Sequence, residues 1–159
     1  MLDDATRLLL PALGPFYQML APFSELLLRL AVGLALLPHG LRSSFGFFRN
    51  TGVPIRSIAM LAADLTRRGY RPGLFWAIGV TLTNILGGLM LAAGLLTRPV
   101  AVPVVILLAL SAFEHARRDG YFWNTQGFEY PALWTVAAAY FLVHGGGVYS
   151  LDHLLGWEL

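Results

Sequence analysis

The stretch GLFWAIGVTLTNILGGLMLAAGLL, residues 73–96, decides the fold class, because none of its 24 residues carries a charge. About 20 consecutive apolar residues are enough for a helix to cross the hydrocarbon core of a bilayer. This stretch is therefore predicted to be a transmembrane helix. The whole chain agrees, since 57% of its 159 residues are hydrophobic and only 13% are charged.

Outward from this stretch, three further windows are predicted as spans, at residues 22–41, 99–116 and 128–147. A preceding apolar segment, 5–20, is broken by prolines and a glycine, and we expect it to be a helix in the membrane interface. Close helix approach in lipid needs small residues, and Ala31 with Ala35 and Gly88 with Ala92 have the required spacing. The predicted fold class is an all-α integral membrane four-helix bundle, a single domain over 1–159.

The distribution of arginine predicts the orientation of the bundle, since all eleven basic residues are arginines. Alternating spans place eight of them at one end, in the connections that begin at residues 42 and 117, and only Arg7 and Arg98 at the other. We call the first the arginine-rich end. The positive-inside rule puts it on the cytoplasmic side of the membrane, with both termini outside. Within the first connection, Ile55 to Arg67 has the apolar periodicity of an amphipathic helix on an anionic leaflet.

Several chemistries are excluded by composition. The chain has no cysteine, which removes thiolate catalysis, disulfide relay and thiolate metal ligation. Its formal charge of +2 and the lack of a basic stripe interleaved with aromatics give no support for nucleic acid as a partner. Membrane lipids are the expected surroundings.

The sequence HGGG, residues 144–147, resembles the oxyanion-hole loop of lipases and esterases. That interpretation requires a nucleophile in the pattern G-x-S-x-G, which the chain does not contain. We therefore expect the glycines to end the fourth helix with positive φ angles, and Ser150 or Asp152 to cap the turn that follows.

Polar residues collect at the arginine-rich end of the predicted spans: His39, Glu114, His115, Gln126, Glu129 and Tyr130. Ionisable groups are costly within a span, so several at one depth favour a shared pocket. The alternative is that they lie just outside the hydrocarbon, solvated among headgroups. Asn84, at the middle of the charge-free span, is expected to hydrogen-bond across the bundle or to line a ligand site. Trp134, with Trp123, is placed to flank a flat headgroup or to join an aromatic belt.

A quinone headgroup suits such a pocket. Its carbonyl oxygens need donors such as His39 or His115, while Glu114 or Glu129 would relay protons to cytoplasmic water. The rival occupant is a haem held by the two histidines, although histidine pairs at helix ends are common without a metal. A zinc or iron site would need a third ligand, and no metal is predicted.

A second polar group is predicted near the opposite end, where Arg29 lies within the first span and needs a partner. Glu25 is four residues away on the same face, and Asp152 is another candidate. Arg98 is placed to hold Asp152 or the last helix carbonyls. The four residues are expected to form a structural network.

Four motifs occur in order: Arg29 and Gly33 followed by His39-Gly40, then GGLMLAAGLLTRPVAV from Gly87, GFEYPAL from Gly127, and the closing Gly-x-Tyr-Ser-Leu-Asp. Together, over about residues 24–152, they resemble the DoxX family of small bacterial membrane proteins. The resemblance implies a four-helix membrane protein associated with redox chemistry; relatives include the small membrane subunit of thiosulfate:quinone oxidoreductase. Where the family pattern usually has a glutamate, this sequence has Asn84.

The functional hypothesis is a redox-associated membrane subunit that interacts with quinone and works with a partner oxidoreductase or respiratory complex. No nucleotide, flavin or thiol motif is present, so electron chemistry would require that partner. The alternative is a non-catalytic anchor or assembly subunit of a larger membrane complex. Transport by alternating access is less well supported, because four spans contain no inverted repeat.

Overall fold

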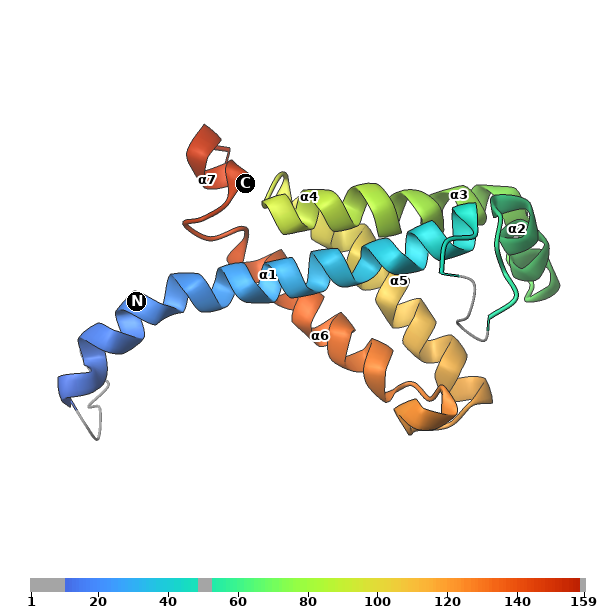
Figure 1. The fold of residues 1–159 in the computed structure, drawn as a ribbon, viewed down its shortest axis with the longest axis horizontal. Coiled ribbons are helices and arrows are strands. Elements are labelled where there is room, and N and C mark those ends of the chain that lie inside the picture. The colour runs from blue at the N-terminus through green and yellow to red at the C-terminus, as the bar shows by residue number, and fades with distance from the viewer. Residues whose placement is uncertain (1–10, 49–52, 158–159) are drawn as a thin grey trace.

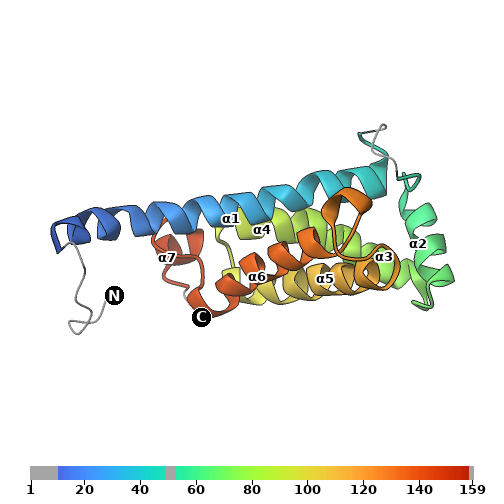
Figure 2. The ribbon, with the colours of Figure 1, turned by 90° about the horizontal axis from the view of Figure 1, so that it is seen from below.

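All regular secondary structure is helical in residues 11–48 and 53–157, which are the residues that the computed structural model describes. Figure 1 shows the helices of residues 14–45 and 73–93 running along one another and those of residues 97–118 and 129–144 running obliquely to them, with short elements at the two ends (Figures 1 and 2). The elements in chain order are η1 (Pro11–Leu13), α1 (Gly14–Phe45), α2 (Ile58–Arg67), α3 (Gly73–Leu82), η2 (Thr83–Gly87), α4 (Gly88–Ala93), α5 (Thr97–Arg118), η3 (Trp123–Thr125), α6 (Glu129–His144) and α7 (Leu151–Leu155).

Helix α1 is longer at both ends than the predicted span 22–41, with 32 residues. The part of the expected interfacial segment that lies in α1, from Gly14 to Leu20, continues directly into the span and forms no separate helix. Residues 5–10 of that segment lie outside the described residues. At 1.5 Å per residue α1 measures about 48 Å, more than the roughly 30 Å hydrocarbon core. Its N-terminal end accordingly extends past the other helices in Figure 1.

The charge-free stretch forms one continuous helix over Gly73–Ala93, but its middle is a π turn, η2. The helix ends three residues before the predicted limit at Leu96. Gly94 and Leu96 have φ angles of +70° and +49°, which reverse the chain into α5.

Among the described residues, three helices are long and apolar enough to cross a bilayer: Gly14–Phe45, Gly73–Ala93 and Thr97–Arg118. The fourth predicted span, 128–147, is helical only over the 16 residues of α6, about 24 Å in length. It packs along α5. As predicted, glycine ends it, since Gly145 has a φ of +74°, and Ser150 then caps α7 by accepting a 3.1 Å hydrogen bond from the His153 N–H.

The arginine-bearing connections share one end of the molecule, as predicted. The Arg68 guanidinium lies 3.7 Å from the carboxylate of Glu114, near the last turn of α5, and the Tyr70 hydroxyl donates to the same carboxylate at 2.9 Å. The predicted amphipathic helix is confirmed as α2, which packs against α3. Ser57 caps it by accepting from the Met60 N–H at 3.2 Å.

Small residues bring α1 and α4 into close contact. A Cβ added to Gly33 would lie 2.5 Å from the Gly88 carbonyl oxygen and 2.6 Å from the Ala92 nitrogen. The prediction for Gly88 and Ala92 is thus confirmed, but their counterpart on α1 is Gly33. The expected partner Ala31 is exposed on another face of the helix.

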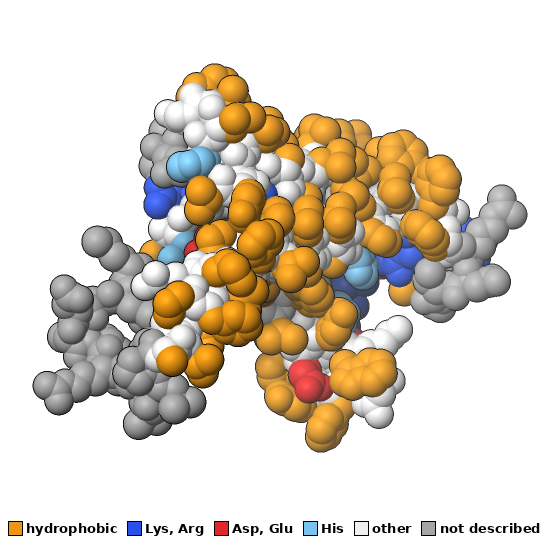
Figure 3. Space-filling view, turned by 60° about the vertical axis from the view of Figure 1, so that its left-hand side comes forward, with side chains coloured by type: hydrophobic (Ala, Val, Ile, Leu, Met, Phe, Trp, Pro, Cys, Tyr) orange, Lys and Arg blue, Asp and Glu red, His pale blue; other side chains and the backbone are white. Residues whose placement is uncertain are grey.

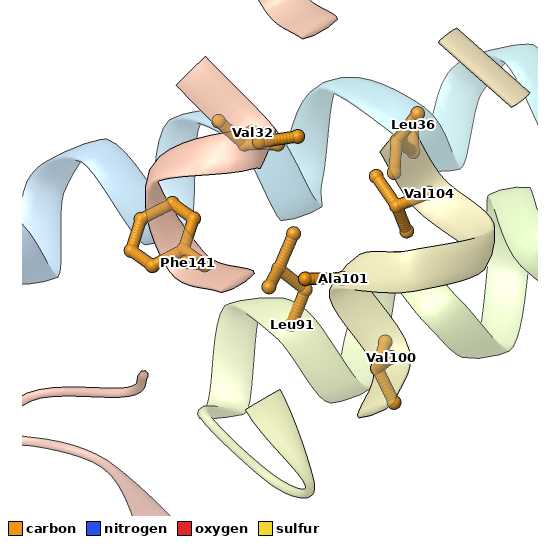
Figure 4. Close-up of a cluster of buried hydrophobic side chains, with 8 residues drawn as sticks. Val32, Leu36, Leu91, Val100, Ala101, Val104 and Phe141 are labelled. Carbon is orange, nitrogen blue, oxygen red and sulfur yellow. The ribbon is translucent and has the colours of Figure 1, made fainter. Parts of the chain in front are cut away.

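The buried apolar core lies beside this crossing, between α1, α4, α5 and α6 (Figure 4). Leu91, Ala101, Val104 and Ala138 are fully buried there. Outside the core, large hydrophobic side chains cover much of the surface in Figure 3. A soluble protein would not expose so much apolar area, so the chain is a multi-pass membrane protein.

Candidate functional site

A cavity of about 820 Å³ lies between α1, η2, α5 and α6, toward the arginine-rich end. Figure 1 shows α1 and α6 diverging toward this end, and in Figure 3 arginine and histidine side chains border a hollow. The connection before α2 and the turn after η3 also contribute to its wall. The lining residues that matter for chemistry are His39, Arg42, Asn84, His115, Tyr130 and Trp134.

The π turn forms one wall of the cavity and carries Asn84, which is 7% exposed. Its Nδ2 donates to the Val80 carbonyl at 2.9 Å. Gly40 of α1 makes room for it, because a Cβ there would lie 2.9 Å from the Asn84 Cβ. Single π turns in long helices are rare and often mark functional sites. In the sequence, the side-chain amide of Asn84 within a charge-free span was the only feature that indicated this wall of the cavity.

Two histidines line the cavity, His39 from α1 and His115 from α5. The His115 Nδ1 lies 2.8 Å from the Ser111 carbonyl oxygen. A carbonyl only accepts, so Nδ1 carries the proton and Nε2 of the neutral ring is left as an acceptor. His39 is exposed, and both of its tautomers remain available to a ligand.

Aromatic rings form the α6 wall. Tyr130 and Trp134 meet edge to face with ring centroids 5.9 Å apart, and Trp123 lines the cavity from η3. Gln126 lies beside them with a positive φ of 64° that turns the chain into α6. The wall offers flat apolar surface with polar groups at its edges.

The opposite end of the bundle is fixed by Arg29, whose side chain is 1% exposed. Its guanidinium donates to backbone carbonyls of Ala92 at 3.2 Å, of Tyr149 at 2.7 Å, and of Gly146. These carbonyls belong to the end of α4 and to the loop after α6. Arg29 therefore joins three segments through backbone acceptors.

A profile of the DoxX family matches residues 24–116, more than half of the chain. The chain belongs to the DoxX family. No match was found among curated proteins or among solved structures. The matched part of this DoxX protein runs from α1 to α5 and holds Arg29, His39, Asn84 and His115, whereas the α6 wall lies beyond it.

Two carboxylates that the sequence grouped with the histidines do not line the cavity of this DoxX protein. Glu114 accepts from the Tyr70 hydroxyl at 2.9 Å and from Arg118 at 2.5 Å. The pKa of Tyr70 is raised mainly by burial and secondly by the hydrogen bond to Glu114. Glu129 accepts from the Trp123 N–H at 3.3 Å. Both carboxylates thus stabilise connections around the cavity, and neither reaches into it.

Arg42 lines the cavity but was counted in the sequence only as a cytoplasmic charge. It follows His39 by three residues on α1, so the two side chains share a face. The three-residue spacing from His39 was the feature of the sequence that could have placed Arg42 at the cavity. Its Nε is buried and has no hydrogen-bond partner within the described part of the chain.

The remaining members of the predicted structural network have separate partners. Asp152 accepts from the Leu96 N–H at 2.6 Å and from Thr97, while Arg98 donates to the Val143 carbonyl at 3.1 Å near the end of α6. Glu25, expected to pair with Arg29, instead accepts from the Tyr140 hydroxyl at 2.9 Å. The stretch GLLTR, residues 94–98 within the second family motif, is therefore where α4, α5 and the C-terminal segment meet.

Proposed function

We propose that this DoxX protein is a redox-associated membrane subunit that holds a quinone headgroup in the cavity and works with a partner oxidoreductase. The observation that carries the proposal is the cavity itself, which lies among the spans and measures about 820 Å³. Pockets for cofactor-sized ligands have volumes of about 300–1,000 Å³. The redox association implied by the DoxX resemblance supports the same assignment.

The lining matches the two ends of a quinone. Apolar side chains such as Val32, Leu36 and Leu108 surround the inner part, where a ring and the start of an isoprenoid tail would lie. Trp134 supplies a flat surface for stacking. The polar side chains of His39 and His115 supply partners for the ring oxygens.

The two histidines suit different redox states of the ligand. A quinone has carbonyl oxygens that only accept, and His39 can donate to one of them. A quinol has hydroxyl groups that donate, and the Nε2 of His115 accepts because its Nδ1 proton is committed to Ser111. In this proposal His115 takes the proton released when a quinol is oxidised and returns it on reduction. Glu114 and Glu129 have no part in that transfer.

The electrons come from a partner, because the sequence has no cysteine and no nucleotide or flavin motif. We place the arginine-rich end in the cytoplasm of a bacterial cell, with both termini outside. Arg67, whose side chain is 75% exposed, is part of the basic surface that the partner or anionic lipids would meet there.

The test is the quinone content of the full-length protein purified in nanodiscs from native membranes. His39→Ala and His115→Ala should lose most of the bound quinone while remaining monodisperse. His144→Ala is the matched control, since His144 stacks on Tyr140 away from the cavity. Wild-type protein without quinone, or cavity variants that retain it fully, would overturn the proposal and favour the anchor function.

A further inference from the structure

The guanidinium of Arg42 is incompletely satisfied at the cavity wall. Its Nε is buried and lacks a hydrogen-bond partner within residues 11–48 and 53–157. A buried donor without a partner costs about 1–3 kcal/mol, and more if it is charged. Guanidinium groups in proteins normally direct their N–H donors at oxygen acceptors, often two at a time. An acceptor on a ligand would remove this cost.

The charge of the cavity wall is unbalanced. Arg42 is the only formally charged side chain among the described lining residues, and no aspartate or glutamate is among them. Two carboxylates of the arginine-rich end are bound to other arginines, Glu114 to Arg118 at 2.5 Å and Asp64 to Arg68 at 2.5 Å. A cation facing an apolar cavity is stabilised by a negative charge placed opposite it.

We infer that Arg42 binds an oxygen of the ligand headgroup, and that the cavity therefore prefers a quinone whose head carries negative charge to a neutral one. The inference rests on the proposed function, because it concerns the same cavity. His39 lies on the same face of α1 three residues earlier and shares the polar end with Arg42. The substrate class is thus an amphiphile with an anionic or readily ionised ring oxygen and an apolar tail.

This preference has a consequence for electron transfer. Electrons from the partner enzyme reduce the quinone, and negative charge builds up on its oxygens until protons arrive to complete the quinol. A positive group beside that oxygen stabilises the charge as it develops. Arg42 would thereby make reduction of the bound quinone more favourable than reduction of the same quinone in the lipid.

Two probes of nearly the same shape test the preference. The ring of 2-hydroxy-1,4-naphthoquinone is an anion at neutral pH, whereas 2-methyl-1,4-naphthoquinone is neutral. Binding of each to the full-length protein, in nanodiscs of uncharged phosphatidylcholine, is followed by quenching of tryptophan fluorescence. Trp123 and Trp134 line the cavity and report bound probe, whereas Trp157→Phe removes an exposed tryptophan outside the cavity and should leave the quenching by bound probe unchanged.

Wild-type protein should bind the anionic probe more tightly than the neutral one. Arg42→Gln should weaken binding of the anionic probe roughly tenfold or more, the usual effect of losing a charged hydrogen bond, and leave the neutral probe nearly unchanged. Arg42→Lys should fall between. Arg67→Gln removes an equal charge from the exposed surface of α2 and should change neither affinity.

The outcomes distinguish the proposed quinone function from the proposed role of Arg42. If neither probe binds wild-type protein, the quinone function itself fails. If both bind equally and Arg42→Gln alters neither, the quinone function stands and the role of Arg42 is overturned. If Arg42→Gln still binds the neutral probe, the variant is folded. If Arg42→Gln binds neither probe, Arg42→Lys decides instead, and equal affinities of the two probes for Arg42→Lys would reject the inference.

Discussion

Asp152 accepts hydrogen bonds from both the backbone N–H and the hydroxyl of Thr97, at 2.7 and 2.6 Å, although the two residues are 55 positions apart. Its other oxygen accepts from the Leu96 N–H at 2.6 Å. The carboxylate is 4% exposed and caps the start of α5, where the helix dipole favours negative charge. This contact fixes the C-terminal segment to the α4–α5 hairpin.

Asp152→Asn should destabilise the protein by about 2–4 kcal/mol, since an amide replaces one acceptor with a donor and removes the charge. The measurement is thermal unfolding in detergent, followed by helical circular dichroism. Asp119→Asn makes the same change at an exposed residue near the other end and should have little effect. Equal midpoints for the two variants would contradict the capping role.

Arg29→Lys should cost about 2–3 kcal/mol, because an ammonium group does not match three carbonyls as the guanidinium fork does. Arg29→Met should cost more, since it leaves all three carbonyls without that donor. Arg98→Lys is the comparison, as Arg98 makes one hydrogen bond within the described residues, to the Val143 carbonyl at 3.1 Å. An Arg29→Lys protein as stable as Arg98→Lys would show that the carbonyl contacts are dispensable.

Gly33→Ala should separate α1 from α4, because its Cβ would meet the Gly88 carbonyl at 2.5 Å and backbone atoms cannot give way cheaply. The expected loss is about 1–3 kcal/mol, as for other overpacked sites. Gly79→Ala, in α3, has nothing within 4 Å of its added Cβ and should be neutral or slightly stabilising. Unfolding in a denaturing detergent series would compare the two, and matching curves would argue against a close crossing.

The stability of the protein is expected to depend on pH through Asp64 of α2. Burial raises the pKa of this carboxyl, but hydrogen bonds from Arg67 and Arg68 outweigh it and lower the pKa below its ordinary value. The ionised form therefore stabilises the fold above about pH 4 and loses this contribution as the pH falls through the lowered pKa. The effect should be below about 1 kcal/mol, since the pair is near the surface. Thermal midpoints between pH 6 and pH 3 should fall less for Asp64→Asn than for wild type.

Single-cysteine labelling tests the membrane orientation cleanly, because the natural chain has no cysteine. Arg67→Cys and Asp119→Cys should react with an impermeant maleimide only from the cytoplasmic side. Leu154→Cys, at an exposed position of α7, should react only from the outside. Labelling of the first two positions from opposite sides would contradict both the proposed topology and the shared arginine-rich end.

The helices were predictable because their signals are local. Uninterrupted apolar length marked Gly73–Ala93, and glycines with positive φ ended α6 where the sequence contained three in a row. The depth of a residue along its helix was also predictable. His39 and His115 were expected at the same end of the spans, and both line the same cavity. The resemblance to DoxX, drawn from motifs on several helices, is confirmed by the family match.

Rotation about a helix axis was harder to predict. Glu114 and His115 are neighbours at one depth, yet successive helical residues point about 100° apart, so one faces Tyr70 and the other lines the cavity. The partners of Arg29 were missed for another reason. They are backbone carbonyls, which every sequence contains, and only the tertiary fold selects Ala92, Gly146 and Tyr149.

The π turn at Thr83–Gly87 contains one residue more than an α-helical turn needs. Deleting one residue there would restore regular winding and redistribute the side chains of the turn, while the halves of the span on either side kept nearly the same facing, because the wide turn already absorbs the extra residue, and α4 stayed packed against Gly33. Asn84 would leave the wall and another side chain would take its place. Insertions and deletions at this position thus offer a way to exchange side chains on the cavity wall without rebuilding the helix pair beside them.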